Sequence, residues 1–416
     1  MKLKKSPLAP DVFPVLPSVA GVGAATASRG FYAKHGTDRD DVFLFVFEPG
    51  TTCAGVFTRS ATASDDVQWC RTALAESAGT ARALIANSGN SNAFTGPDGR
   101  LKNEATLKAL TDALGVAPSE CYIAATGVIG EALPNPNYVG EIVPELKQAL
   151  SDPNWEDCAR AFMTTDTFPK GSGLEFTIEG TPIRIAGIAK GSGMIAPNMA
   201  TMLAFVFTDA SISAPLLDQL VRRAVEPSFN AITVDGDTST SDTLIVFATG
   251  KAGGSQIKDE ADPRCADILE GLKTVCLDLA HQIVRDGEGA TKFVTIDVSG
   301  TDTDADAKCI AASVANSPLV KTALAANDAN WGRVVMAIGN AGVPLDQSQL
   351  SIWFGDVLLA EGGRRAPTYS EEAATEAVSA DNLLIRIKLG SGTGTSRIYT
   401  CDLTHGYVDI NGAYRT

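Results

Sequence analysis

Histidine is scarce in this chain. Only His35, His281 and His405 occur among its 416 residues, so a zinc site or a Ser-His-Asp triad would have few residues to draw on. The eight cysteines are scattered and form no C-x-x-C pair. We therefore expect neither a metal site nor a nucleophile that depends on histidine.

Lysine and arginine are also few compared with aspartate and glutamate, and this imbalance limits the kinds of partner that the protein can bind. The 34 Lys and Arg residues stand against 49 Asp and Glu residues, which gives a formal net charge of −15. No basic run continues past Lys5, so the electrostatic footprint of a nucleic-acid-binding protein is missing. No apolar run approaches the ~18 residues of a membrane-spanning helix, and prolines interrupt the segment after the first lysines. We predict a cytoplasmic protein that binds neither nucleic acid nor membranes.

Complete phosphate-binding and calcium-binding loops are absent as well. Two Gly-rich stretches approach the pattern G-x-G-x-x-G, but Ala196 and Arg397 occupy the third glycine position. The acidic stretch 235–242 approaches a calcium loop, yet Thr240 stands where that loop needs glycine. The glycine and hydroxyl residues of 235–242 suit a tight turn near an active site instead.

Short apolar runs alternate with helical patterns along the chain. This mixture favours α/β or α+β layers over an all-helical or all-β fold. A boundary is expected near 289–291, after the longest helical pattern. Strands are predicted at 42–47, 53–58, 83–86, 122–125, 176–178, 183–188, 202–207, 294–298, 383–389, 397–401 and 406–410, and helices at 62–78, 104–114, 139–150, 155–164, 215–226 and 265–284.

The stretch 190–210 is the most unusual in the sequence. A Gly-rich loop leads through Pro-Asn into a run that is apolar on both faces, and Thr201 stands where the predicted strand begins. A threonine hydroxyl is a poor nucleophile unless a base is adjacent. Cleavage between Ala200 and Thr201 would free the α-amine of Thr201, and an amine of pKa ~7.7–8.0 suits a base near neutral pH. Thr201 is therefore a candidate N-terminal nucleophile; the alternative is a threonine that only satisfies backbone groups at the strand start.

The segment 190–203 (KGSGMIAPNMATML) strongly resembles the self-processing segment of the ornithine acetyltransferase family, also called glutamate N-acetyltransferase. Six further blocks agree with this family in the same order, so the resemblance covers nearly the whole chain. These blocks are 87–93 (NSGNSNA), 125–130 (ATGVIG), 163–167 (MTTDT), 234–240 (VDGDTST), 287–292 (GEGATK) and 411–416 (NGAYRT).

The resemblance implies a fold and a division of the chain. The implied fold is an αββα-type sandwich, shared with self-processing aminopeptidases, with a smaller C-terminal α/β lobe. Cleavage after Ala200 would give an α chain, 1–200, and a β chain, 201–416. Within the β chain, 201–289 would complete the sandwich, about 290–400 would form the smaller lobe, and 401–416 would close the active site.

The resemblance also implies roles for single residues. Thr201 would be the nucleophile of both self-cleavage and acetyl transfer. Thr126 and Gly127 would form the oxyanion hole, where a hydroxyl and a glycine N–H can meet developing negative charge. Substrate would be bound by Thr164, Lys190, Thr201, Glu288, Asn411 and Thr416, with Glu288 pairing with an amino group of ornithine; the register of the threonine within 164–167 stays open.

The implied reaction transfers the acetyl group of N2-acetyl-L-ornithine to L-glutamate through an acetyl-Thr201 intermediate, releasing ornithine and N-acetylglutamate in cyclic arginine biosynthesis. No metal or organic cofactor is expected, and the use of acetyl-CoA as a second donor is left open. The processed chains are expected to stay together as an α2β2 assembly. An amidohydrolase or aminopeptidase of the same superfamily is the first alternative, and a non-catalytic binding protein with this fold is the second.

Overall fold

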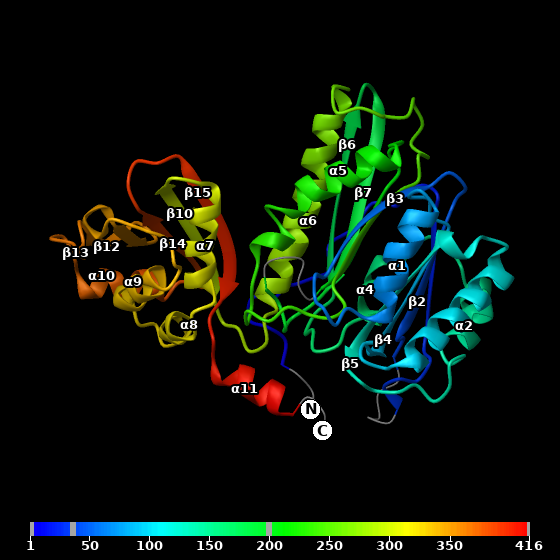
Figure 1. Ribbon diagram of the computed structural model, residues 1–416, viewed down its shortest axis with the longest axis horizontal. Helices are drawn as coiled ribbons and strands as arrows, with labels where there is room; N and C mark the ends of the chain where they lie inside the picture. The colour runs from blue at the N-terminus through cyan, green and yellow to red at the C-terminus, as the bar shows by residue number, and fades with distance from the viewer. Residues whose placement is uncertain (1–3, 34–38, 197–201, 414–416) are drawn as a thin grey trace.

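The computed structural model describes residues 4–33, 39–196 and 202–413 of the chain. Figure 1 shows two bodies: a larger sandwich that contains β1 to β9, and a smaller lobe that contains β10 to β15. The last helix, α11 (His405–Gly412), lies below and between them.

The first sheet of the sandwich has the strand order β1-β2-β4-β5. The pairs β1–β2 and β2–β4 are antiparallel, whereas β4 and β5 run parallel. Five of the six residues of β2 are buried, because both faces of this sheet are covered. The strands are β1 (Val22–Ala27), β2 (Val42–Phe47), β4 (Ala83–Asn90) and β5 (Cys121–Val128).

The second sheet has the order β3-β9-β8-β7-β6. Its one parallel pair is β8–β9, and the helix α5 lies in the connection between these two strands. The predicted hairpin around Glu179 and Gly180 joins β6 to β7. The strands are β3 (Thr52–Phe57), β6 (Lys170–Ile178), β7 (Thr181–Lys190), β8 (Leu203–Thr208) and β9 (Thr243–Ala248).

Aromatic side chains hold the two sheets face to face. The ring centres of Phe45 and Phe207 lie 4.6 Å apart, and those of Phe43 and Phe205 lie 5.7 Å apart. Phe43 and Phe45 belong to β2, whereas Phe205 and Phe207 belong to β8. These contacts define successive layers of side chains between the sheets.

Helices cover the outer face of each sheet, so the layers follow the order αββα, and the predicted sandwich is confirmed. The helices α5 (Ala214–Val225) and α6 (Arg264–Arg285) pack on the second sheet, and α2 (Pro97–Leu114) and α3 (Val143–Gln148) pack on the first. Two more helices, α1 (Asp65–Glu76) and α4 (Trp155–Ala161), contact both sheets at their edges.

The smaller lobe has a mixed sheet with the order β13-β12-β11-β14-β10-β15 and its own apolar core. Buried residues alternate with half-exposed ones along β10, as expected for a sheet covered on one face. The strands are β10 (Phe293–Thr301), β11 (Ser351–Phe354), β12 (Val357–Glu361), β13 (Arg364–Arg365), β14 (Asn382–Lys388) and β15 (Gly394–Cys401). The helices are α7 (Asp304–Ala315), α8 (Pro318–Ala325), α9 (Trp331–Gly339) and α10 (Glu371–Val378), and short 3-10 helices occur at Pro118–Glu120, Gly140–Ile142, Phe229–Ala231 and Gln347–Gln349.

Two predicted elements near the candidate site differ from the structure in extent. The strand predicted at 122–125 continues through Thr126 and Gly127, because β4 pairs with β5 as far as Asn90 and Val128. The helix predicted at 155–164 already ends at Ala161 and leaves the following residues in a loop.

One predicted element is of the wrong type. Residues 406–410 were expected to form a closing strand but belong to the helix α11. The side chain of Thr404 caps this helix by accepting a hydrogen bond from the N–H of Gly406. Val408, which would face a core in a strand, is 68% exposed here.

Within the described ranges, no helix combines the length and the apolar composition that a membrane crossing requires.

Candidate active site

The register of the two sheets places Thr126 and Lys190 in one layer. Ala124 shares the layer of Phe43, and Ile188 shares the layer of Phe205 on the facing sheet. Side chains two residues apart on a strand point to the same face. Thr126 and Lys190, each two residues further along, therefore both project into the next layer between the sheets.

This layer lies at the start of β8. Lys190 pairs with Leu203, the first residue of β8, and Thr126 pairs with Ser88 on β4. The hydroxyl of Ser88 donates to the backbone oxygen of Ala161, 2.8 Å away, where α4 ends and the loop to Thr164 begins. The first sheet is thus tied directly to the loop that carries a predicted substrate residue.

Gly127 occupies a position that no side chain could share. Its φ is +141°, and a Cβ added there would lie 2.5 Å from the carbonyl carbon of Gly89 and 2.6 Å from the nitrogen of Asn90. Both neighbours are backbone atoms of the adjacent strand, so they cannot move aside as a flexible side chain could. Close pairing of β4 and β5 at this point therefore requires glycine.

Lys190 and Thr164 contact each other directly. The ammonium of Lys190 donates to the hydroxyl of Thr164, with 2.8 Å between Nζ and Oγ1. The neighbouring threonines have other partners: Thr165 lies 2.7 Å from Ser192, oxygen to oxygen, and Thr167 donates to Asp286. Within 164–167, the geometry favours Thr164 as the partner of Lys190.

Glu288 approaches the same loop from the chain that follows α6. Its N–H donates to the backbone oxygen of Ser192 at 2.9 Å, and Asn411 Nδ2 donates to its Oε2 at 2.6 Å. Burial raises the pKa of Glu288, and hydrogen bonds from Thr165 and Asn411 partly offset that effect. A carboxylate that is only 8% exposed would gain from a cationic ligand group.

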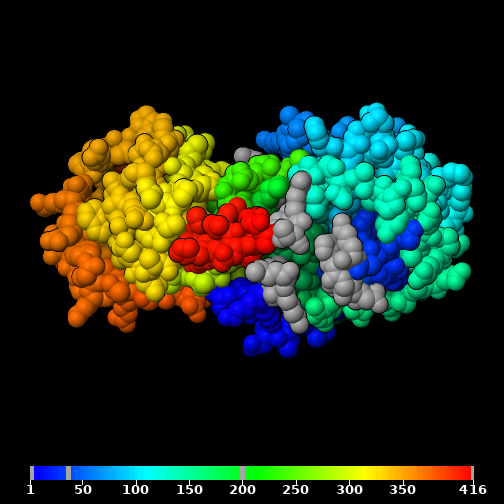
Figure 2. Space-filling model, turned by 90° about the horizontal axis from the view of Figure 1, so that it is seen from below, coloured from blue at the N-terminus to red at the C-terminus, as the bar shows by residue number. Residues whose placement is uncertain are grey.

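The helix α11 reaches this site without burying any of its residues. It is held by polar contacts: besides the bond from Asn411, the hydroxyl of Thr404 donates to the oxygen of Gly289 at 2.7 Å. Figure 2 shows α11 at the junction between the smaller lobe and the sandwich. The helix α11 therefore lies beside Glu288 at the candidate site.

Asp235 connects this helix to the Gly-rich loop. Its carboxylate accepts from the N–H groups of Met194 at 2.6 Å and Ile195 at 2.9 Å, and from the hydroxyl of Tyr407 at 3.3 Å. The acidic stretch 235–242 thus starts in a turn beside the candidate site, as its composition suggested.

Three predicted site residues, Ala200, Thr201 and Thr416, lie outside the described residues. The structure brings Thr126, Gly127, Thr164, Lys190, Glu288 and Asn411 to one region, through the contacts and layers described above. Their individual roles stay predictions.

The charged residues near Lys190 were not predicted from the sequence. Asp166 and Asp286 both bind the buried ammonium of Lys170. Two features of the sequence could have indicated these carboxylates. Asp166 lies inside the block 163–167, and Asp286 directly precedes the block 287–292. Lys170 begins the first of two Lys-Gly-Ser-Gly tetrapeptides, and Lys190 begins the second.

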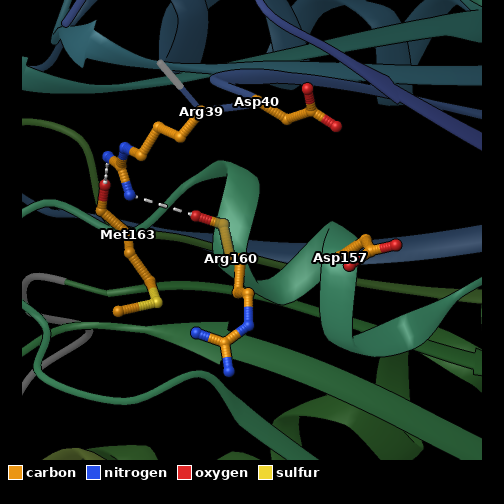
Figure 3. Close-up of a pocket in the computed structure, with 5 residues that line it drawn as sticks. All are labelled: Arg39, Asp40, Asp157, Arg160 and Met163. Atoms are coloured by element: carbon orange, nitrogen blue, oxygen red, sulfur yellow. Dashed lines mark hydrogen bonds between the residues drawn. The ribbon is translucent and has the colours of Figure 1, made fainter. Parts of the chain in front are cut away.

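A separate pocket of about 270 Å³ lies next to the loop that carries Thr164. It is lined by Arg39, Asp40, Asp157, Arg160 and Met163. Figure 3 shows the guanidinium of Arg39 donating to the backbone oxygens of Arg160 and Met163, over 3.3 and 2.5 Å. These bonds fix the end of α4, but the pocket contains no predicted site residue. Among the described residues, no cluster of His, Cys, Asp and Glu could hold a metal ion.

Comparison with known proteins gives matches to one family. The ArgJ family profile matches residues 24–416. The chain is similar to the arginine biosynthesis bifunctional protein ArgJ of Rhizobium meliloti (49% identity over 99% of both chains) and of Brucella suis biovar 1 (48% identity over 100% of both). A crystal structure of the bifunctional protein from Bacillus halodurans matches with 41% identity and a TM-score of 0.49, covering 51% of this chain and 100% of that one.

Proposed function

The chain belongs to the ArgJ family, and from that premise we propose that it transfers the acetyl group of N2-acetyl-L-ornithine to L-glutamate in arginine biosynthesis. The observation that best supports this reaction is the layer between the two sheets. Thr126 and Lys190 point into that layer at the start of β8, and the buried carboxylate of Glu288 lies on the adjoining loop. The substrates are amino acids, which carry charges that Lys190 and Glu288 complement.

Self-cleavage prepares the nucleophile. The hydroxyl of Thr201 attacks the carbonyl carbon of Ala200, the amide C–N bond breaks, and the nitrogen of Thr201 takes up the hydroxyl proton, so that the acyl group moves from nitrogen to Oγ. Water then hydrolyses this ester, which releases the carboxylate of Ala200 and leaves Thr201 with a free hydroxyl and a free α-amine. In the transfer reaction this amine takes the proton of Oγ while Oγ attacks the acetamide carbonyl of the donor. The oxyanion is stabilised by Thr126 and Gly127. When it collapses, the C–N bond breaks, the ornithine nitrogen takes the proton held by the α-amine of Thr201, and ornithine leaves. The amine of glutamate then attacks the acetyl ester and regenerates Thr201.

Charge complementarity orients the substrates. The ammonium of Lys190 attracts a substrate carboxylate, and Glu288 pairs with an amino group of ornithine. Asn411 and Thr416 close the site from the C-terminal end. The same region would bind ornithine, N-acetylornithine, glutamate and N-acetylglutamate in turn, as a ping-pong reaction requires.

The proposal includes further partners and a location. The reaction needs no metal or organic cofactor, since the protons and the acyl group pass between substrate and protein. Acetyl-CoA is the donor to be tested beside N-acetylornithine, because the relatives carry the word bifunctional in their names. We expect the α and β chains to form an α2β2 assembly in the cytoplasm.

Purified protein should consist of two fragments, residues 1–200 and 201–416, that separate only on denaturation. N-terminal sequencing of the second fragment should begin Thr-Met-Leu-Ala. Fully active protein that remains a single intact chain would contradict the N-terminal nucleophile.

The assay that tests the reaction supplies acetyl-labelled N-acetylornithine with and without glutamate. Label should appear in N-acetylglutamate, and little free acetate should form when glutamate is present. Release of acetate at the same rate in both samples would instead identify the amidohydrolase alternative.

Gly193→Ala should specifically weaken binding of the donor. A Cβ at Gly193 would lie 2.4 Å from both Cδ and Oε2 of Glu288, so the carboxylate must move from its position. Overpacking of this kind costs about 1–3 kcal/mol, which corresponds to a rise in KM for N-acetylornithine of roughly 5- to 150-fold. Gly339→Ala is the matched control, because nothing lies within 4 Å of a Cβ there. Equal KM values for both variants would argue against Glu288 as a donor-binding residue.

A further inference from the structure

The two Lys-Gly-Ser-Gly tetrapeptides share one carboxylate. Their lysines, Lys170 on β6 and Lys190 on β7, both turn toward Asp166. The distance from Nζ to the nearest carboxylate oxygen is 2.7 Å for Lys170 and 3.8 Å for Lys190. The side chains of Lys170 and Asp166 have no exposed surface, and that of Lys190 is 8% exposed. The repeated tetrapeptide thus places two buried ammonium groups, those of Lys170 and Lys190, beside the carboxylate of Asp166.

Asp166 also binds two backbone N–H groups, that of Thr164 and that of the residue directly after Lys190. One carboxylate oxygen accepts from the N–H of Thr164 at 3.0 Å. The other accepts from the N–H of Gly191, directly after Lys190, at 2.6 Å and from Lys170 at 2.7 Å. A single carboxylate therefore connects the loop of Thr164 with the end of the strand that carries Lys190.

The two lysines differ in how far they depend on Asp166. Lys170 has a second carboxylate, Asp286, at 2.6 Å, and the oxygen of Phe168 at 3.3 Å. Among the described residues, Asp166 is the one carboxylate within 4 Å of the ammonium of Lys190, whose other close partner is the neutral hydroxyl of Thr164. The charge of Lys190 therefore depends on Asp166 more than the charge of Lys170 does.

We propose that Asp166 is a positioning residue for acetyl transfer: it keeps the buried ammonium of Lys190 charged and aligned with Thr164 for a substrate carboxylate. This inference rests on the proposed function, because it assigns Lys190 to substrate binding. Lys170 binds Oδ1 of Asp166 and is itself bound by Asp286, whereas Lys190 lies nearest to Oδ2 of Asp166.

The surrounding charges predict the direction of the pH effect. Burial lowers the pKa of Lys190 and the charge of Lys170 lowers it further, whereas Asp166, Glu288 and Asp242 raise it. The charged form of Lys190 is the one that binds a carboxylate, so activity falls as pH rises through this pKa. Removing the charge of Asp166 takes away a stabilising anion and moves the loss of activity to lower pH.

The test is the pH profile of kcat/KM for N-acetylornithine in the processed enzyme and in Asp166→Asn. We expect the alkaline limb of the variant to move down by at least about one pH unit, the usual effect of an opposite charge within ~4–6 Å. The substrate amine titrates identically with every variant, so differences between variants report the protein.

Asp209→Asn is the matched control. Asp209 is also fully buried and accepts from the N–H of Arg184 at 2.8 Å, but it lies beyond the far end of β8 from Leu203. This variant should be less stable to heat, like Asp166→Asn, while its alkaline limb stays at the wild-type position. Coincident limbs for Asp166→Asn and Asp209→Asn would overturn the proposal.

A second pair of variants applies if Asp166→Asn does not fold. Lys170→Met and the double variant Asp166→Asn/Lys170→Met differ only at Asp166, and the double variant loses one buried charge of each sign. The limb of the double variant should lie at least about one pH unit below that of Lys170→Met, and coincident limbs here too would overturn the proposal. If the wild-type protein transfers no acetyl group at all, the proposed function is refuted instead. That result can be distinguished from the two comparisons of pH profiles, because both comparisons require an active wild-type protein.

Discussion

Thr201→Ala is expected to yield a single uncleaved chain that transfers no acetyl groups. The substitution removes Oγ, so neither the acyl shift at Ala200 nor attack on the donor can begin. Loss of a covalent nucleophile from a catalytic unit typically lowers the rate by about 10⁴- to 10⁶-fold. Gel electrophoresis measures the cleavage, and the labelled-donor assay measures the transfer. The uncleaved chain should still fold, because both sheets of the sandwich depend on apolar contacts elsewhere.

Thr201→Ser is the matched control for this prediction. It keeps the hydroxyl and should process, more slowly than wild type, because the missing methyl group no longer restricts χ1. With acetyl-labelled donor and no acceptor, mass spectrometry should find an acetyl group on the oxygen of residue 201, and glutamate should discharge it faster than water does. If no such adduct forms in a single turnover, the acetyl group passes directly between bound substrates and Thr201 serves maturation alone.

The sandwich was predictable because its strands carry a strong local signal. Continuous apolar runs such as 42–47 and 202–207 are typical of strands buried on both faces, and the long helix α6 repeats its apolar residues at helical spacing. The C-terminal helix α11 was missed for the opposite reason. Its helical form depends on the cap at Thr404 and on polar contacts with distant residues, and the short apolar alternation within 406–410 imitates a strand.

Some residues of the candidate site could likewise be predicted from the sequence, and others could not. The motif around Thr201 and the pair of Thr126 and Gly127 follow from chemistry and from the resemblance to the family. The charged residues near Lys190 could not be predicted in this way. Lys170 binds Asp286, which lies 116 positions away in the sequence, and no local pattern indicates that contact. Even the two Lys-Gly-Ser-Gly tetrapeptides gain a meaning only when strand pairing brings β6 beside β7.

Thr126→Ala should slow both reactions of the protein by about 10²- to 10³-fold, the usual consequence of losing one oxyanion-hole donor. The physical reason lies in the layer between the sheets, where Thr126 and Lys190 face the same space. Self-cleavage and acetyl transfer each build a negative oxygen on a tetrahedral carbon, so one donor can serve both. Backbone strain plays no part in this substitution, in contrast to any side chain at Gly127.

Two variants make the prediction about Thr126 specific. Thr126→Ser keeps the hydroxyl and should restore most of the rate of both reactions. Thr295→Ala removes a half-buried threonine from β10 in the smaller lobe and should change neither rate. The time course of fragment formation gives the rate of maturation, and kcat of protein that has fully matured gives the rate of transfer. If maturation slows while kcat stays at the wild-type value, Thr126 assists cleavage only, and the oxyanion of the transfer reaction must be stabilised by other donors, beginning with the backbone of Gly127.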